Sequence, residues 1–194
     1  MAQFVAFNPT VEVNGETVLS IVNGMEMFKK EAFDILKTNG IDNPKPGLWY
    51  PQQAWLNAFK TISEKLGANT LFLIGKKIPE SAQWPPFVDN IEKALGSIDI
   101  AYHMNHRIGV EALFNPMTGV MKEGIGHYGF SKAGDTSVVM VCNNPYPCDF
   151  DRGIIDAAAK KFKPSNVLTV NTRHDDSQPC RKKGHDSCTY LVNW

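Results

Sequence analysis

Two short stretches carry all four cysteines of the chain and constrain its fold more than any other feature. Cys142 and Cys148 lie in "VCNNPYPC", and Cys180 and Cys188 lie in "CRKKGHDSC". The N-terminus lacks a basic segment followed by an apolar one, so we expect no signal peptide and a cytoplasmic protein with reduced thiols. Four reduced cysteines favour a metal site over disulfides. The alternative is that some or all of them are small buried hydrophobic residues.

The residues around the cysteines predict a C-terminal ββαββ unit. Alternating apolar residues predict two strands within 126–143 and one strand each within 166–174 and 187–194. Between them, "DRGIIDAAAKKF" predicts a helix that Pro164 ends. Because consecutive strands tend to pair antiparallel, we expect an α+β fold, in which helices pack on an antiparallel sheet.

The N-terminal half is expected to be mostly helical after a short hairpin. Asn14 and Gly15 separate two apolar-alternating runs, and this dipeptide is a strong hairpin signal. Apolar residues at helical spacing predict helices over 25–40 and 51–67. A third helix is expected over 87–107, with a weak point at Gly96, so the helices precede the sheet in the chain.

The predicted strand pairing brings metal-binding side chains together. If the strand ending at His174 pairs with the strand carrying Cys188, both residues lie at the mouth of one hairpin. Cys180 lies in the connecting loop and can fold back, and Cys148 precedes a helix whose positive end favours a thiolate. The fourth ligand is His174, or Cys142 in its place. Either set forms a closed arrangement typical of structural zinc.

The stretches "NPYPCDFDRGII" and "PCRKKGHDSCTYLVNW" resemble the 4-vinyl reductase-like domain. That family shows a cysteine ahead of a helix and two cysteines near the C-terminus. The resemblance is specific over residues 125–194 and looser over 48–124. It implies a fold related to heme-NO-binding and trafficking-complex domains, often dimeric. We therefore expect a single domain, with residues 1–47 as an N-terminal hairpin and helix extension and 48–194 as the 4-vinyl reductase-like domain.

The resemblance also implies a ligand set. In phenol-sensing transcription regulators this domain carries zinc on three cysteines and one acidic residue, near a buried pocket for an aromatic ligand. Cys148, Cys180 and Cys188 match the three cysteines. The acidic ligand has no clean match in this chain, and His174 or one of the two aspartates that follow it could take its place. The resemblance therefore implies structural zinc as the cofactor.

A second candidate site lies in "DIAYHMNHRIG", where His103 and His106 stand three residues apart on the predicted helix. Such a pair can hydrogen-bond a ligand, or serve as a second-metal or heme ligand. The alternative is a helix end whose histidines cap carbonyl groups or face solvent. Aromatic side chains elsewhere either line an apolar pocket or simply fill the core. The expected ligand-binding residues are His103, His106, Tyr102, Trp55, Trp84 and Tyr128.

These observations favour a sensor module over an enzyme. We expect an apolar or aromatic small molecule as ligand and signalling through a partner or a homodimer. The alternatives are a reductase or accessory enzyme of tetrapyrrole metabolism, and a heme-based gas sensor that uses His103 or His106. No motif predicts a catalytic residue, so whether the chain is an enzyme stays open. Zinc is the expected cofactor in preference to heme.

Charge and hydropathy exclude two classes of partner. Lys+Arg and Asp+Glu are both 20, so the chain has no basic excess with which to bind nucleic acid. No apolar run reaches the length of a membrane span, so we expect none.

Overall fold

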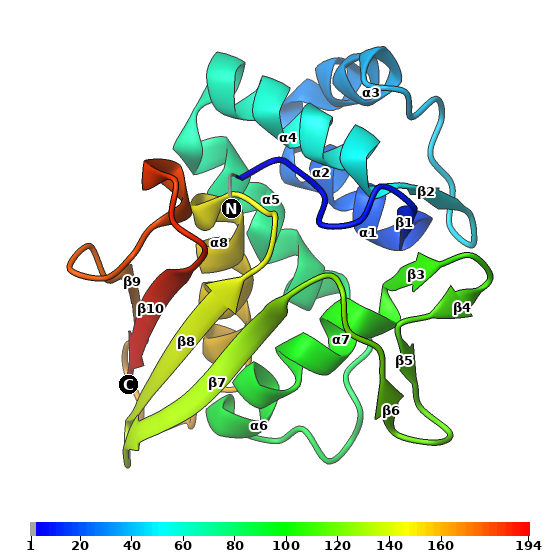
Figure 1. Cartoon of the computed structure of the whole chain (residues 1–194). Coiled ribbons are helices and arrows are strands. Elements are labelled where there is room, and N and C mark those ends of the chain that lie inside the picture. The colour runs from blue at the N-terminus through cyan, green and yellow to red at the C-terminus, as the bar shows by residue number, and fades with distance from the viewer. Residues whose placement is uncertain (1–2) are drawn as a thin grey trace.

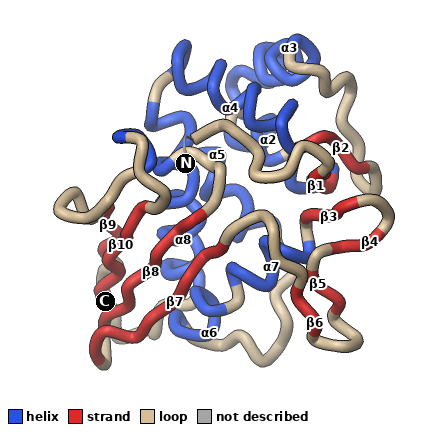
Figure 2. Tube along the Cα trace, viewed as in Figure 1, coloured by secondary structure: helices blue, strands red, loops and turns tan. Residues whose placement is uncertain are grey.

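The computed structural model describes residues 3–194 and combines helices with antiparallel sheets, which confirms the α+β prediction. The first two residues of the predicted N-terminal extension lie outside this range. Figure 1 shows most of the helices gathered on one side and the C-terminal sheet on the other, with a small arm of short strands beside them. Figure 2 shows the same division by secondary structure.

The helices vary widely in length. They are α1 (Gly15–Val18), α2 (Ser20–Gly24), α3 (Lys29–Thr38), α4 (Gln52–Leu66), α5 (Ala68–Ser81), α6 (Ile91–Gly96), α7 (Ile98–Met104) and α8 (Cys148–Lys161), with the 3-10 helices η1 (Glu26–Phe28) and η2 (Arg181–Lys183). Of these helices, all within the described residues, none is both long and apolar enough for a membrane span.

The strands form three antiparallel sheets. They are β1 (Val11–Asn14), β2 (Trp49–Pro51), β3 (His106–Ile108), β4 (Glu111–Ala112), β5 (Phe114–Asn115), β6 (Val120–Met121), β7 (His127–Gly134), β8 (Ser137–Asn143), β9 (Asn171–His174) and β10 (Cys188–Asn193). The sheet orders are β2-β1-β3-β4, β7-β8-β10-β9 and β5-β6.

The predicted ββαββ unit is present as β7-β8-α8-β9-β10. β10 lies between β8 and β9 and pairs antiparallel with both, so the last strand in the chain fills the middle of the sheet. In this register Cys188 lies opposite Cys142, and Tyr190 lies opposite His174. The β9–β10 pairing therefore places His174 near the start of β10, as the alternation of apolar residues indicated.

The predicted N-terminal hairpin is wrong. Instead of turning a hairpin, Asn14 caps α1, because its side-chain oxygen accepts a hydrogen bond from the backbone N–H of Thr17 at 2.9 Å. Gly15 allows the backbone to pack closely against Lys45, since a Cβ atom at this position would lie 1.9 Å from the carbonyl oxygen of Lys45. β1 pairs instead with β2 and β3, two segments distant in sequence.

The predicted helix over 87–107 is also wrong in extent. It divides into α6 and α7 directly after Gly96, where a weak point was expected, but it begins later than predicted and His106 belongs to strand β3. The structure adds α5, which the sequence reading did not identify. α5 crosses α8 at glycines, because a Cβ atom on Gly75 would lie 2.1 Å from the carbonyl oxygen of Phe150. One on Gly153 would lie 2.2 Å from the carbonyl oxygen of Phe72.

Candidate functional site

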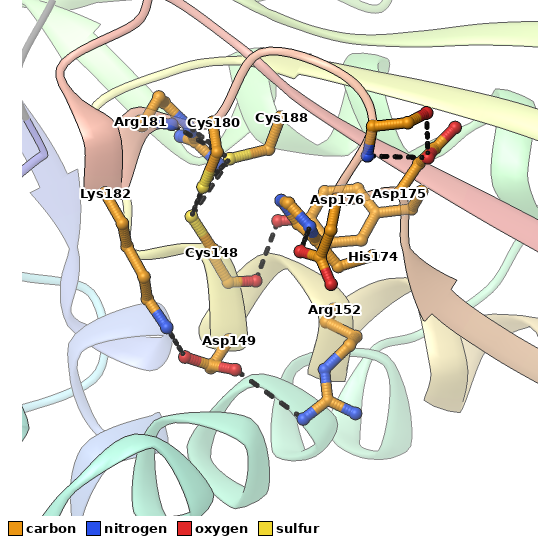
Figure 3. A network of polar contacts seen from close by, with 12 residues as sticks. Cys148, Asp149, Arg152, His174, Asp175, Asp176, Cys180, Arg181, Lys182 and Cys188 are labelled. Atoms are coloured by element: carbon orange, nitrogen blue, oxygen red, sulfur yellow. Dashed lines mark hydrogen bonds and ion pairs between the residues drawn. The ribbon is translucent and has the colours of Figure 1, made fainter.

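Four side chains from separate elements meet at one end of the C-terminal sheet, and we call them the thiol–imidazole cluster: Cys148, His174, Cys180 and Cys188. Their ligand atoms all lie within 4.8 Å of one another. Cys148 begins α8, His174 ends β9, Cys180 precedes η2 and Cys188 begins β10. The Sγ atom of Cys148 lies 2.9 Å from that of Cys188 and 3.7 Å from that of Cys180 (Figure 3).

His174 has the orientation of a metal ligand. Its Nδ1 atom lies 2.8 Å from Oδ1 of Asp176. Its Nε2 atom is buried and has no hydrogen-bond partner among the described residues. Histidines that bind metals are commonly held in this way, with one ring N–H donated to a carboxylate while the other nitrogen offers its lone pair. An unpaired buried nitrogen would otherwise be costly.

The thiols of Cys148 and Cys188 differ in pKa. The hydrogen bond between Cys148 and Cys188 lowers the pKa of the Cys188 thiol and raises that of the Cys148 thiol. The guanidinium of Arg181 lowers the pKa of Cys188 further, and its Nε atom lies 3.5 Å from Sγ of Cys188. A thiolate at Cys188 is therefore favoured even without a metal, and thiolates are the metal-binding form of cysteine.

The cluster opens on a small solvent-facing pocket of about 150 Å³. The wall of the pocket carries both positively and negatively charged side chains. Lys182 forms an ion pair with Asp149, and Nη2 of Arg152 lies 3.6 Å from Oδ1 of the same aspartate. Cys148 and Cys180 line this pocket although all three cysteines are buried, so a small ion can reach these two residues without their being widely exposed.

Cys142, the alternative fourth ligand, stands apart from the cluster. It lies in β8 opposite Cys188, but its sulfur is not among the four grouped ligand atoms. Burial raises the pKa of its thiol well above the ordinary value. The structure therefore places His174, and not Cys142, beside the three other cysteines.

The sequence analysis did not predict a buried ion pair that lies next to the thiol–imidazole cluster. The side chains of Arg181 and Asp151 form an ion pair at 1% and 0% exposure. Arg181 also donates to the carbonyl and side-chain oxygens of Asn144, and Asp151 accepts from the hydroxyl of Tyr128 at 2.6 Å. Burial raises the pKa of Asp151 to about 6, although Arg181 and Tyr128 oppose that rise. "CRKKG" looks like a solvent-facing basic run, which hides the buried arginine.

A second region lies between the helices and the C-terminal sheet, and we call it the ring cluster: Trp55, Phe59, Tyr102, His106, Tyr146 and Phe150. All six side chains are buried. The ring centroids of Trp55 and Tyr146 are 5.1 Å apart, and those of Tyr102 and His106 are 4.6 Å apart. These separations are typical of stabilising aromatic pairs. The rings come from α4, α7, β3, the loop before α8, and α8 itself.

His106 is held as a neutral imidazole inside the ring cluster. Its Nδ1 atom lies 2.7 Å from the carbonyl oxygen of Tyr102, and Nε2 is hydrogen-bonded to the hydroxyl of Tyr146. Burial lowers its pKa to about 4. The Nδ1 atom therefore donates to the carbonyl, and Nε2 accepts from Tyr146. Both nitrogens of His106 are satisfied by the protein itself.

His103 differs from His106 in having a free nitrogen. The side chain is fully buried, and Nδ1 lies 2.8 Å from the carbonyl oxygen of Asp99, to which it donates. Nε2 then carries the lone pair, and no described residue provides it with a hydrogen bond. Next to it, Asp99 lies 2.9 Å from Nδ1 of His127, and this hydrogen bond raises the pKa of His127.

The other predicted ligand residues lie in different surroundings. Tyr128 is buried, its ring centroid is 5.3 Å from that of Tyr102, and its hydroxyl is bound to Asp151. Trp84 is half-buried just after the C-terminal end of α5, where its ring meets Phe162 edge to face and its Nε1 donates to the carbonyl of Pro79 at 3.0 Å. The structure thus brings Trp55, Tyr102 and His106 together and separates Trp84 from them.

Comparison with solved structures identifies the fold. An H-NOX protein of S. oneidensis in the Fe(II)NO state aligns with a TM-score of 0.63 at 12% identity, covering 93% of this chain and 98% of that one. An H-NOX protein of T. tengcongensis aligns with a TM-score of 0.63 at 16% identity, covering 93% and 96%. A study of heme distortion in the H-NOX family provides a third, with a TM-score of 0.60 at 15% identity, covering 93% and 94%. No protein-family model and no curated protein matches the chain.

These findings correct the cofactor prediction. We expected zinc as the cofactor and set heme aside, whereas the solved structures that share the fold come from work on heme proteins. The expected relation to heme-NO-binding folds is confirmed at the level of fold. The narrower resemblance to the 4-vinyl reductase-like domain gains no support, since no family model matches. The chain has the fold of the H-NOX domains.

Proposed function

We propose that the chain is a sensor module that binds heme between its helices and its C-terminal sheet, with His103 as the iron ligand. The observation that carries the proposal is the buried Nε2 atom of His103, which has no partner among the described residues. The hydrogen bond from Nδ1 to the carbonyl of Asp99 fixes the tautomer whose Nε2 can bind a metal. His106 is the weaker candidate, because Tyr146 already occupies its Nε2.

The side chains of the ring cluster are chemically suited to contact heme, but they pack against one another and leave no space for it. Aromatic faces suit a flat tetrapyrrole, and two further buried groups lack partners within the described chain, Nε1 of Trp55 and Oε1 of Gln52. The rings are in mutual contact, however, so a porphyrin requires them to separate. The proposal therefore couples binding to an opening of the ring cluster. When bound, heme would supply an iron that can take a diatomic gas.

The test is titration of the purified protein with hemin, followed by absorbance. We expect a saturable Soret band at one hemin per chain, and its loss or strong shift in His103→Ala. His127→Gln is the matched control, because His127 is a neighbouring histidine whose two nitrogens are both engaged by carboxylates. Absence of a Soret band in the wild type, or an identical band in His103→Ala, would refute the proposal.

A second candidate ligand is an apolar or aromatic small molecule in the same ring cluster. It is favoured by the unpaired Trp55 donor and Gln52 acceptor, which lie on the first turn of α4 and suit a ligand with one acceptor and one donor. Saturable quenching of tryptophan fluorescence by a phenol, without any Soret band on addition of hemin, would favour this candidate over heme.

For the thiol–imidazole cluster we propose a closed site for one thiophilic metal ion, which holds the loop between β9 and β10. The unpaired Nε2 of His174 and the three convergent sulfur atoms support it. Elemental analysis of protein purified without a histidine tag identifies the metal. We expect about one ion per chain in the wild type and in Cys142→Ser, and little in Cys180→Ser or Cys188→Ser. Four free thiols with no metal would contradict the site.

A further inference from the structure

We infer that the thiol–imidazole cluster and the His103 region are energetically coupled through a series of hydrogen bonds formed by Arg181, Asp151, Tyr128 and Asp99, of which the first three are buried. This inference rests on the proposed metal site and extends the proposed function, because it makes the ligand region responsive to what the cysteines bind.

The first link joins the sulfur atoms to Arg181. The backbone N–H of Arg181 lies 3.4 Å from Sγ of Cys188, and its side-chain Nε lies 3.5 Å from the same atom. The arginine is adjacent in sequence to Cys180, another cluster member. With its side chain 1% exposed, Arg181 cannot exchange these partners for bulk water. Its position therefore depends on the charge and placement of the sulfur atoms.

The second link runs from Arg181 into α8 and β7. Arg181 Nη2 is paired with Oδ2 of Asp151, whose other oxygen accepts from the Tyr128 hydroxyl at 2.6 Å. All three side chains are buried, and Nη1 of Arg181 donates to the carbonyl and side-chain oxygens of Asn144. Charged hydrogen bonds in such surroundings are strong, and a change in one partner must be taken up by the next.

The third link reaches His103. The backbone N–H of Tyr128 donates to Oδ1 of Asp99 at 2.8 Å. The carbonyl oxygen of Asp99 accepts from Nδ1 of His103, also at 2.8 Å. Asp99 and His103 are both on α7, so a shift of β7 at Tyr128 acts on the helix that positions His103. The Tyr128 ring also packs on Tyr102, a ring-cluster member.

Metal loading would fix the start of this series of hydrogen bonds. A bound cation would hold the three sulfur atoms in one arrangement, and Arg181, which contacts Sγ of Cys188, would be held with them. Loss of the cation would release the sulfur atoms and, with them, Arg181. Because linkage is reciprocal, occupancy of the ring cluster must also change metal affinity if the two sites are coupled.

The test follows α7 directly while Co²⁺ is added to metal-stripped protein. Co²⁺–thiolate absorbance reports occupancy of the cysteines, and hydrogen exchange reports the opening of residues 98–104. We expect at least fivefold slower exchange in α7 when Co²⁺ is bound. Tyr128→Phe removes the hydroxyl in the middle of the chain and should reduce this ratio towards one. Tyr50→Phe, which loses a hydroxyl bonded to the Lys45 N–H, is the matched control and should keep the wild-type ratio.

The outcomes separate the coupling from the heme proposal. Slower exchange in α7 on Co²⁺ addition, without hemin binding, supports the coupling and refutes only the heme proposal. Unchanged exchange with Co²⁺ bound overturns the coupling, whether or not hemin binds. Failure of Co²⁺ to bind overturns it as well. A Tyr128→Phe protein that keeps the full Co²⁺ effect would overturn the proposed route through Tyr128. If Tyr128→Phe does not fold, Asp99→Ala removes the carboxylate that accepts from the Tyr128 N–H and tests the neighbouring link in the same way.

Discussion

At the scale of single residues, His106 gives the protein a defined pH dependence. Burial lowers its pKa from 6.5 to about 4, so the folded protein resists protonation that the unfolded chain accepts. His106 therefore contributes up to about 3 kcal/mol to the free energy of unfolding. This contribution is fully present above pH 6.5 and is lost as the pH falls from 6.5 to about 4. Urea unfolding at a series of pH values measures this loss. In His106→Gln the contribution should disappear.

Asp151 acts in the opposite direction and must be separated from His106. Its pKa is raised by burial to about 6, so its contribution to stability falls as the pH rises from about 4 to 6. Because His106→Gln retains Asp151, the difference between the two proteins isolates the histidine. Parallel stability curves for wild type and variant over this range would show that His106 is not the titrating group.

At the scale of elements, the crossing of α5 and α8 depends on two glycines. A methyl group on Gly153 would lie 2.2 Å from the carbonyl oxygen of Phe72, which is backbone and cannot turn aside. We expect Gly153→Ala to destabilise the fold by about 1–3 kcal/mol or more. Chemical unfolding checks this, with Gly96→Ala as the control, since its nearest new contact would be 4.0 Å away. Equal stability of the two variants would contradict the crossing.

Elements whose pattern is local were predictable, and those set by distant partners were not. The strands β7, β8 and β10 and helix α8 alternate or repeat within their own residues. Asn14-Gly15 has the composition of a hairpin turn. However, β1 pairs with strands near residues 49 and 106 instead of with the residues that follow it, and Asn14 caps helix α1. His106 likewise continues a helical pattern until β1 takes it as a strand partner. Tertiary pairing decided both cases.

At the scale of the whole molecule, the proposed metal ties together elements from across the C-terminal half. Removing it would leave three buried thiols and an unpaired imidazole where the β9–β10 loop meets α8. We expect a strong chelator to lower the wild-type melting temperature by several degrees, and Cys142→Ser to respond similarly. In Cys188→Ser, melting should already be low and insensitive to the chelator. An unchanged wild-type melting curve would contradict a stabilising metal.

The sequence predicted that the three cysteines lie close together, with His174 or Cys142 as the fourth member, but it did not predict their surroundings. Strand alternation sufficed to place His174 near Cys188, because β9 and β10 pair as expected. The buried Arg181–Asp151 pair was not predictable, since charged residues are ordinarily exposed and only the folded chain supplies their partners. The resemblance around the cysteines implied a relation to heme-NO-binding folds, and comparison of the structures confirmed it at the level of fold, at identities of only 12–16%.

The place of β10 in its sheet has a consequence for biosynthesis. β10 lies between β8 and β9, yet the ribosome makes it after both. Until residues 188–193 have left the exit tunnel, β8 and β9 expose the edges that β10 will join, and the nascent chain lacks Cys188. The sheet and the proposed metal site can therefore be completed only after residues 188–193 have been made. A chain that stalls before this strand would present two open edges to chaperones or to other nascent chains.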